Sequence, residues 1–451
     1  MISAREVALK VLYQIEVEDA YANLALSHYL GQLKLSTLER GLATELVYGV
    51  TRSRNTLDWI LSQFITSGLK KLTPWIRNIL RLGVYQLFYL KKIPESAAVN
   101  ESVNLAKKYG HAGTVKLVNG VLRNLIRKKA NIEFPSLADD PVGHISLKYS
   151  HPAWLIEKWL KEFGEKETME LCQANNQPSA NSIRTNTLKT TPESLKEQLE
   201  LQDIKVDQSR FVPEGLLISN FSNLENLEGF KNGLFLMQDE SSMLVSYLLQ
   251  PKPGSFLIDS CAAPGTKTTH LAQMAKDDCQ IIACDVHEHK LELIAQNCQR
   301  LGLKSIKPNL LDARKIGQVY QGQADYILVD APCSGLGVLR RRPDARWKKN
   351  PKQIKELSIL QLEILKGVCG ALKQGGVLVY STCSISPEEN IEVIKKFLHL
   401  HQEFKLDSIR NLLPFELTRD EDISLAEKGC MQFLPHVHGT DGFFMARMVR
   451  N

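Results

Sequence analysis

The sequence predicts a multidomain protein, in which an all-helical bundle is followed by a small α/β subdomain and a larger, mainly parallel α/β domain. A chain of 451 residues is too long for one ordinary hydrophobic core. Apolar residues recur at helical spacing throughout residues 1–130, whereas short apolar runs alternate with helical stretches from about residue 240. We therefore expect domains at residues 1–135, 145–235 and 236–451.

The helical region contains recognisable helix starts. Ser3-x-x-Glu6 has the pattern of a capping box, and Thr73-Pro74 places a cap residue before a proline at the first helical position. A last helix is predicted over about residues 114–129. Helices of this kind are expected to pack as a bundle.

The net charge of +6 is unevenly distributed. Residues 1–135 contain 19 Lys and Arg against 10 Asp and Glu, which gives +9 and leaves −3 for the remainder. A basic first third on a nearly neutral body suggests an appended nucleic-acid-binding module. A solvated helical surface explains the same charge, and charge alone does not separate the two interpretations.

The composition indicates an ordinary globular protein of a reducing compartment. No apolar run approaches the ~18 residues of a membrane helix, and the N-terminus lacks the pattern of a secretory signal. The nine cysteines include no Cys-x-x-Cys pair, which argues against a zinc site or a disulfide framework. We expect a cytoplasmic protein with reduced cysteines, no metal site and no membrane contact.

The rest of the chain is predicted to be α/β. Residues 131–150 read as a linker, and the region after them combines a helix at 153–163 with strands at 182–186 and 215–219. The strands predicted for the larger domain are residues 256–259, 281–285, 326–330 and 377–381. Parallel sheets bind their ligands beyond the carboxyl ends of the strands, and every motif described next falls there.

A loop of small residues follows the first of these strands and leads into a helix. Its members are Cys261, Ala262, Ala263, Pro264, Gly265, Thr266 and Lys267. The loop matches neither a dinucleotide nor a triphosphate motif, and alone it is weak evidence, because such turns are often only tight packing. Asp285 ends the next strand, and Asp312 follows a third predicted strand. Carboxylates there suit the ribose hydroxyls and the adenine amino group of S-adenosylmethionine, although helix caps use the same residue type.

Two cysteines lie just past the other strands, in Asp330-Ala-Pro-Cys333 and Thr382-Cys383-Ser384. A cysteine on a strand is most often a small core residue. Against that interpretation, both cysteines fall at the ligand-binding edge. Carbon 5 of cytosine attacks a methyl donor only after a thiolate has added to carbon 6, which is covalent catalysis. The cysteines and the loop together point to methyl transfer to carbon 5 of a cytosine.

The motifs also resemble known families. Residues 1–130 resemble the NusB family of RNA-binding helical domains, through Ala4-Arg-Glu-Val-Ala-Leu-Lys-Val-Leu-Tyr13 and Val118-Asn-Gly-Val-Leu-Arg123. Residues 151–451 resemble RNA cytosine-5 methyltransferases, with further matches in Ser386-Pro-Glu-Glu-Asn390 and Thr440-Asp-Gly-Phe-Phe444. The whole chain resembles the Fmu/Sun family of bacterial 16S ribosomal RNA methyltransferases.

The resemblance implies a Rossmann-like class I methyltransferase domain and assigns roles by position. Cys383 is the nucleophile, Cys333 assists release of the product, and Asp330 contacts the pyrimidine edge beside the methyl donor. Residues 261–267, Asp285 and Asp312 hold S-adenosylmethionine. Thr266 departs from the family, which usually has a second glycine there, so this position must avoid a positive φ.

The same resemblance implies a monomer that acts on 16S ribosomal RNA, at cytosine 967, and not on DNA. A DNA cytosine-5 methyltransferase uses the cysteine of the Pro-Cys motif as its nucleophile, so Thr382-Cys383-Ser384 argues against it. The remaining alternative is an RNA-binding ribosome- or transcription-associated factor without turnover. The segment 339–349 contains six basic residues and a tryptophan, and we expect it to contact RNA by phosphate binding and base stacking, although an exposed charged loop has the same composition.

Overall fold

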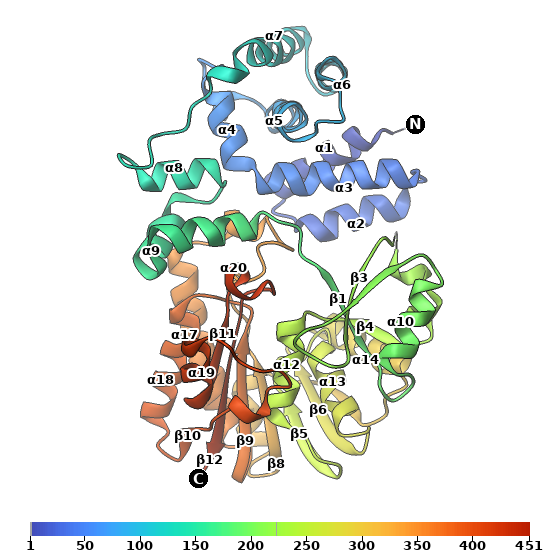
Figure 1. Ribbon diagram of the computed structural model, residues 1–451, viewed down its shortest axis with the longest axis vertical. Helices are drawn as coiled ribbons and strands as arrows, with labels where there is room; N and C mark the ends of the chain where they lie inside the picture. Colours follow the sequence, from blue (N-terminus) through green and yellow to red (C-terminus); the bar gives the residue numbers. More distant parts are fainter. Residues whose placement is uncertain (1, 222) are drawn as a thin grey trace. The chain divides into compact units, whose positions relative to one another are not determined.

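The computed structural model describes residues 2–221 and 223–451, which form two compact units (Figure 1). One unit comprises residues 2–177 and 339–348, and the other comprises residues 178–221, 223–338 and 349–451. The chain therefore leaves the second unit after Val338 and re-enters it at Lys349. Among the described residues, no helix combines the length and apolar character that crossing a bilayer requires.

The first unit is helical, as the sequence predicts. Its helices are α1 (Ala4–Val17), α2 (Ala22–Gln32), α3 (Thr37–Arg52), α4 (Arg54–Ser62), α5 (Pro74–Tyr89), α6 (Glu95–Tyr109), α7 (Ala112–Lys128), α8 (Pro141–Lys148), α9 (Ala153–Asn175) and, in the inserted segment, α16 (Ala345–Lys348). Helix α5 is buried on most of its surface because α1, α3, α4, α6 and α7 all pack against it.

Two local predictions in this unit need correction. The Ser3 hydroxyl accepts a hydrogen bond from the Glu6 amide at 3.3 Å, but the Glu6 carboxylate is bound by Lys108 and Tyr109 instead of returning to the cap. The predicted linker contains α8, an eight-residue helix capped by the Asp140 side chain. Pro141 occupies the first position of α8, where a missing amide hydrogen removes no helical bond.

The second unit contains a small antiparallel sheet of order β2-β3-β1-β4. Its strands are β1 (Asn181–Thr185), β2 (Lys205–Gln208), β3 (Gly215–Ser219) and β4 (Phe235–Met237), with the helices α10 (Pro192–Glu200) and α11 (Glu228–Lys231). The predicted strands at 182–186 and 215–219 correspond to β1 and β3. The helix predicted at 153–163 continues as α9 beyond a kink at Gly164 and clusters with the helical unit.

The large sheet has the order β10-β12-β9-β8-β5-β6-β7, with β11 paired to β12. Its strands are β5 (Ser255–Asp259), β6 (Cys279–Asp285), β7 (Ile306–Leu310), β8 (Ala324–Asp330), β9 (Leu372–Thr382), β10 (Phe404–Leu406), β11 (Cys430–Phe433) and β12 (Phe443–Arg450). The five adjacent strands β9, β8, β5, β6 and β7 run parallel to one another. Strand β12 is antiparallel to β9, β10 and β11.

Helices cover both faces of this sheet (Figure 1). One face packs against α12 (Glu240–Leu249), α13 (Thr266–Met274) and α14 (Glu288–Leu301), and the other against α15 (Ile316–Val319), α17 (Pro351–Cys369) and α18 (Ile391–Leu400). Leu257 and Ile281 face the first group, whereas Ile258 and Ile282 face the second. The central strands are apolar on both sides for this reason. Two short helices, α19 (Asp420–Glu427) and α20 (Pro435–His438), complete the unit.

Candidate active site

The two candidate cysteines meet at the carboxyl ends of adjacent parallel strands. Asp330 of β8 pairs in register with Ser381 of β9, so the segments that follow both strands emerge side by side. The Sγ atoms of Cys333 and Cys383 are 3.3 Å apart, and both side chains are half-buried. The Gly337 amide donates to the carbonyl of Cys383 at 3.0 Å, which ties the two segments together.

The hydrogen bond with Cys383, followed by burial, raises the pKa of Cys333 well above its ordinary value. Either sulfur can donate in the contact between them. A thiolate is the nucleophilic form of cysteine, and the raised pKa disfavours that form at Cys333.

A lysine from the small-residue loop supplies positive charge beside the cysteines. Lys267 Nζ lies 2.7 Å from Asp330 Oδ2, and Ser381 Oγ donates to Asp330 Oδ1 at 2.7 Å. Burial opposes the charge of Lys267, but Asp330 and the sulfur of Cys383 outweigh it and raise the lysine pKa. Lys267 is therefore an ammonium whose field favours a thiolate at Cys383.

Sequence reasoning missed the side chain that joins the two cysteine segments. Glu389 is fully buried, and its carboxylate accepts hydrogen bonds from the Ser334 amide at 2.7 Å and from the hydroxyls of Ser334 and Ser384. Gln361 of α17 donates to the same carboxylate at 3.3 Å. Each serine follows one of the cysteines directly, so Glu389 positions both. The only sequence signal was its place in the Ser386-Pro-Glu-Glu-Asn390 motif.

The small-residue loop connects β5 to the N-terminus of α13, as the sequence predicts. Gly265 has φ +94°, and a Cβ there would come within 3.3 Å of Ile294. Thr266 already lies in α13 and is absent from the positive-φ positions, so the residue that departs from the family is unstrained. The Ala262 amide donates to the Cys284 carbonyl at 2.8 Å, which holds the loop against the end of β6.

Asp285 and Asp312, the two carboxylates predicted to bind the cofactor, differ in the number of their hydrogen bonds to protein groups. Asp285 accepts a hydrogen bond from the His287 amide at 3.0 Å through Oδ1, and among the described residues its other oxygen has no such donor. Asp312 caps a short helical turn and is paired with Arg314 through both oxygens, at 2.9 Å from the Arg314 amide and 2.7 Å from Nη2. The alternative interpretation as a cap therefore describes all observed contacts of Asp312, whereas Asp285 retains an oxygen for a ligand.

Comparisons with known proteins agree along the whole chain. Residues 246–449 match the family described as 16S rRNA methyltransferase RsmB/F, residues 2–127 the NusB family and residues 151–225 a ferredoxin-like domain of RsmF/B-like methyltransferases. The probable ribosomal RNA small subunit methyltransferase B of Bacillus subtilis is 39% identical over 448 residues, which cover 99% of this chain and 98% of that protein. The protein of the same name from Synechocystis sp. is 38% identical, with 99% of each chain covered.

The chain belongs to the RsmB/F family of rRNA methyltransferases.

Solved structures support the fold of this RsmB/F family member. The crystal structure of PH0851 superposes with a TM-score of 0.83 at 29% identity and covers 100% of this chain and 99% of its own. The structure of NSun6 from Pyrococcus horikoshii with SFG has a TM-score of 0.60 at 27% identity and covers 66% of this chain and 98% of its own. The NusB-like helical part, the ferredoxin-like subdomain and the methyltransferase domain with its mixed sheet are thus all confirmed.

A second side chain that sequence reasoning missed is Arg184, on β1 of the small sheet. It is 1% exposed, and burial lowers its pKa to about 9. Its guanidinium donates to the Thr266 carbonyl at 2.6 Å and to Thr269 Oγ1 at 3.0 Å. Arg184 therefore holds the first turn of α13, and with it the loop predicted to bind the cofactor, against the ferredoxin-like subdomain of this RsmB/F family member.

The basic segment 339–349 was predicted to contact RNA, but two of its basic side chains bind protein groups instead. Arg346 is fully buried and donates to the Ser150 carbonyl at 2.9 Å and to Asn176 Oδ1 at 2.9 Å. Lys348 is paired with Asp19 at 3.0 Å. The expectation that these two side chains contact phosphate is wrong, because protein groups already occupy them. They anchor the segment on the NusB-like unit, and the Trp347 ring beside them lines a cavity described below.

Proposed function

We propose that this protein transfers a methyl group from S-adenosylmethionine to carbon 5 of a cytosine in 16S ribosomal RNA, through a covalent bond between Cys383 and carbon 6. The observation that carries the proposal is the pair of sulfurs 3.3 Å apart at the ends of β8 and β9, with Lys267 and Asp330 beside them. Family membership supports rRNA as the substrate class and a methyl donor as the cofactor.

The residues at the carboxyl edge of the sheet fit the cofactor. The turn at Gly265 brings backbone and small side chains to the start of α13, where a ligand can approach closely. Asp285 would accept from the ribose hydroxyls, and Asp312 would reach the adenine only by exchanging its contacts with Arg314. When bound, S-adenosylmethionine supplies an electrophilic methyl group.

Cys383 would add to carbon 6 of the target ring, which makes carbon 5 nucleophilic. Lys267 lowers the cost of the thiolate, and Asp330, held by Lys267 and Ser381, would contact the amino edge of the cytosine. The base must leave its stack, or lie in a single-stranded loop, before a thiolate reaches carbon 6.

Cys333 would act after the methyl group has been transferred. Carbon 5 must then lose its proton while the bond between carbon 6 and Cys383 breaks. The neighbouring sulfur of Cys383 is the first cause of the raised pKa of Cys333. Once that sulfur is bonded to carbon 6, it is no longer a thiolate that favours the protonated form of Cys333. Cys333 would then lose its own proton to solvent and take the proton from carbon 5, while Cys383 leaves carbon 6 as a thiolate and the double bond between carbons 5 and 6 re-forms.

The NusB-like unit would supply RNA affinity. Helix α7 buries Val118, Leu122 and Leu125 and exposes Arg123 and Arg127 on its other side. A groove of about 390 Å³ lies between α6 and α7 and is lined by these two arginines. Exposed arginines along a groove suit contact with the phosphates of an RNA strand.

Methyl transfer from labelled S-adenosylmethionine to 16S ribosomal RNA tests the proposal, with mapping of the modified base. We expect 5-methylcytosine at one position, which the resemblance to the Fmu/Sun family gives as cytosine 967. Binding of the RNA without any transfer of label would favour the alternative, an RNA-binding factor without turnover. Transfer to naked RNA and to ribosomal particles should be compared, because the two substrates present the target base differently.

A further inference from the structure

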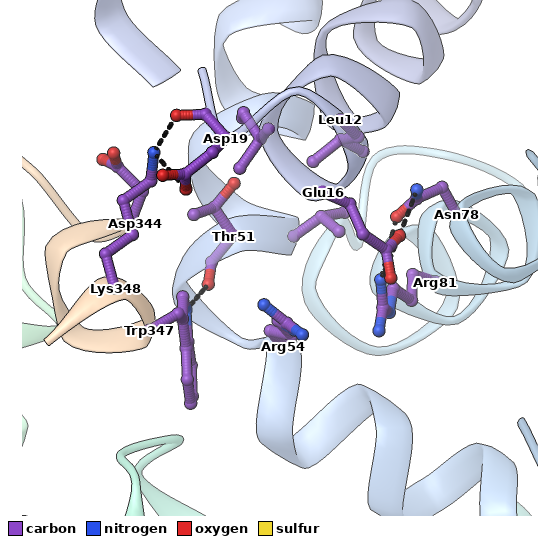
Figure 2. Close-up of a pocket in the computed structure, with 12 residues that line it drawn as sticks. Leu12, Glu16, Asp19, Thr51, Arg54, Asn78, Arg81, Asp344, Trp347 and Lys348 are labelled. Atoms are coloured by element: carbon purple, nitrogen blue, oxygen red, sulfur yellow. Dashed lines mark hydrogen bonds and ion pairs between the residues drawn. The ribbon is translucent and has the colours of Figure 1, made fainter. Parts of the chain in front are cut away.

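A cavity of about 250 Å³ lies within the helical unit, outside the candidate active site (Figure 2). Its apolar lining comes from Leu12, Ile15 and Val50, and its far wall from Asp344, Trp347 and Lys348 of the inserted segment. The volume is slightly below the roughly 300–1,000 Å³ of pockets for drug-sized ligands. The cavity is therefore suited to a small planar group, such as a single nucleobase.

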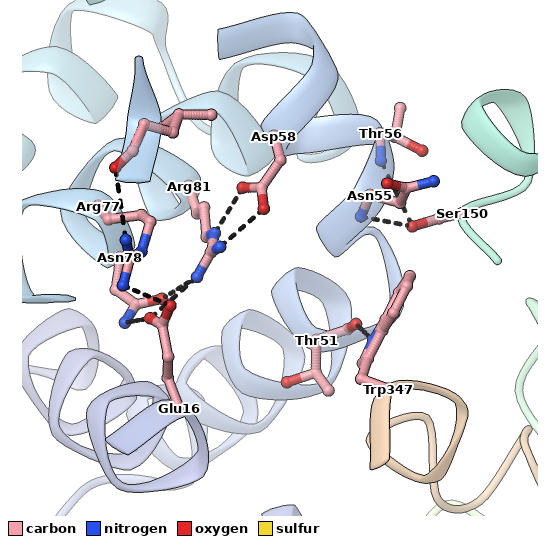
Figure 3. Close-up of polar contacts among 11 residues, drawn as sticks. Glu16, Thr51, Asn55, Thr56, Asp58, Arg77, Asn78, Arg81, Ser150 and Trp347 are labelled. Carbon is pink, nitrogen blue, oxygen red and sulfur yellow. Dashed lines mark hydrogen bonds and ion pairs between the residues drawn. The ribbon is translucent and has the colours of Figure 1, made fainter. Parts of the chain in front are cut away.

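Protein contacts hold the walls of this cavity in place. The indole N–H of Trp347 donates to the Thr51 carbonyl at 2.7 Å, which fixes the plane of the ring. Figure 3 shows the opposite wall, where Arg81 binds Asp58 at 2.6 Å and Glu16 at 3.0 Å. These charged groups are already paired and have little left to offer a ligand.

Two charged side chains of the cavity are different. Arg54 is half-buried and makes no hydrogen bond or ion pair within the described part of the chain, and its guanidinium carbon lies 5.7 Å from the centre of the Trp347 ring. Asp344 is 2% exposed, and neither of its oxygens has a hydrogen-bond partner among the described residues. The buried hydroxyl of Thr51 likewise has no hydrogen-bond partner in the part of the chain that the structure describes. Burying a carboxylate without partners is unfavourable, so these groups are arranged for something that binds there.

We propose that this cavity binds an unstacked guanosine of the RNA substrate, at a position other than the target cytosine. Aromatic rings such as Trp347 stack on bases that have left their helix. A carboxylate with two unused oxygens matches an edge with two adjacent N–H donors, and among the four bases only guanine has such a Watson–Crick edge. Arg54 then matches the phosphate of the same nucleotide, which all four nucleotides share. The inference rests on the proposed action on RNA and adds a sequence requirement to it.

The position of the cavity in the chain gives it a role in target selection. Asp344 and Trp347 belong to the segment that begins at Leu339, six residues after Cys333. A guanosine held by this segment would be read together with the cytosine that enters the candidate active site. Two bases read by one continuous stretch of chain select a site more strictly than one base does.

The first test is a titration of the full-length protein with GMP, AMP, CMP and UMP, in which NMR or calorimetry measures the binding. We expect GMP to bind at least tenfold more tightly than the other three, and Asp344→Asn to remove this preference, because an amide replaces one acceptor with a donor. Arg54→Ala should weaken all four nucleotides. Lys107→Ala removes the same charge from an exposed position on α6 and should change none of them. Equal binding of all four nucleotides, or of GMP to the wild type and to Asp344→Asn, overturns the proposal.

A second experiment, with RNA, tests whether the cavity binds a guanosine within the RNA substrate or a free guanine nucleotide. Replacing one guanosine after another by inosine, which lacks the amino group at position 2, should at one position raise KM at least tenfold for the wild type and leave Asp344→Asn unaffected. If GMP is preferred but no inosine changes KM, the site serves a free guanine nucleotide and the RNA assignment is wrong. Unchanged S-adenosylmethionine affinity in Asp344→Asn controls for folding. Failure of the proposed function itself is distinct, because wild-type protein would then transfer no label to any RNA.

Discussion

Replacing Asp285 by asparagine should weaken S-adenosylmethionine binding without disturbing the fold. Asp285 is 9% exposed at the end of β6, and within the described part of the chain the His287 amide binds its Oδ1 and no group binds its Oδ2. Asparagine keeps an oxygen for that amide. It replaces the other carboxylate oxygen by an amino group, which cannot accept a hydrogen bond from a ribose hydroxyl.

The expected loss follows from the number of hydrogen bonds affected. A hydrogen bond to a charged group contributes about 1.5–3 kcal/mol. Loss of one such bond corresponds to roughly 10- to 150-fold weaker binding. Asp312→Asn is the matched control, because both oxygens of Asp312 are already held by Arg314 on the protein surface. Exchange of one exposed ion pair contributes about 0–1 kcal/mol, so we expect less than about fivefold there.

Calorimetric titration with S-adenosylmethionine at one pH and one salt concentration measures both variants. Weakened binding in Asp285→Asn alone agrees with the assignment. Wild-type affinity in Asp285→Asn, with a large loss in Asp312→Asn, would transfer the ribose contact to the third strand. Wild-type affinity in both variants would refute the assignment of the cofactor to the ends of β6 and β7.

Three further predictions concern the mechanism, the helical region and pH. Cys383→Ala should form no covalent complex with RNA, whereas Cys333→Ala should methylate and then stall as a complex that survives a denaturing gel; the opposite pattern reverses the two roles. Deleting residues 1–130 should weaken RNA binding and flatten its dependence on salt while leaving cofactor affinity intact, and an unchanged salt slope would assign these residues to another partner. Burial, together with the neighbouring Asp330, raises the pKa of Asp259 to about 7. The folded protein then holds a proton that the unfolded chain releases above about pH 4, so stability falls as pH rises towards 7. Asp259→Asn should reduce the drop in Tm between pH 5 and pH 8, and an equal drop in both proteins would contradict this linkage.

The secondary structure could be predicted because its signals are local. Thr73 accepts from the Ile76 amide as a cap residue before proline should, and the four apolar runs of the large domain are the strands β5, β6, β8 and β9. Local signals failed where one residue type occurs in two structural contexts, as proline does in loops and at the first position of a helix. Residues 131–150 were predicted to be a linker because they contain proline and glycine, but Pro141 begins α8.

The basic segment shows why composition does not identify a partner. Six basic residues and a tryptophan suggest RNA contact, yet Arg346 is fully buried against carbonyl groups of the same unit. Whether a charged side chain faces solvent depends on what packs over it. That information lies in α9 and in the helical bundle, far from the segment in sequence.

The sequence by itself determined which residues stand at the carboxyl edge of a parallel sheet, because hydrophobic runs and the turns that follow them are read from neighbouring residues. Only the tertiary structure decided how those residues meet. The contact between Cys333 and Cys383 spans 50 residues, and that between Lys267 and Asp330 spans 63. Both depend on β8 lying between β5 and β9, and the burial of Glu389 depends on the same order. Strand order is set by the packing of the whole domain, so no local pattern contains it.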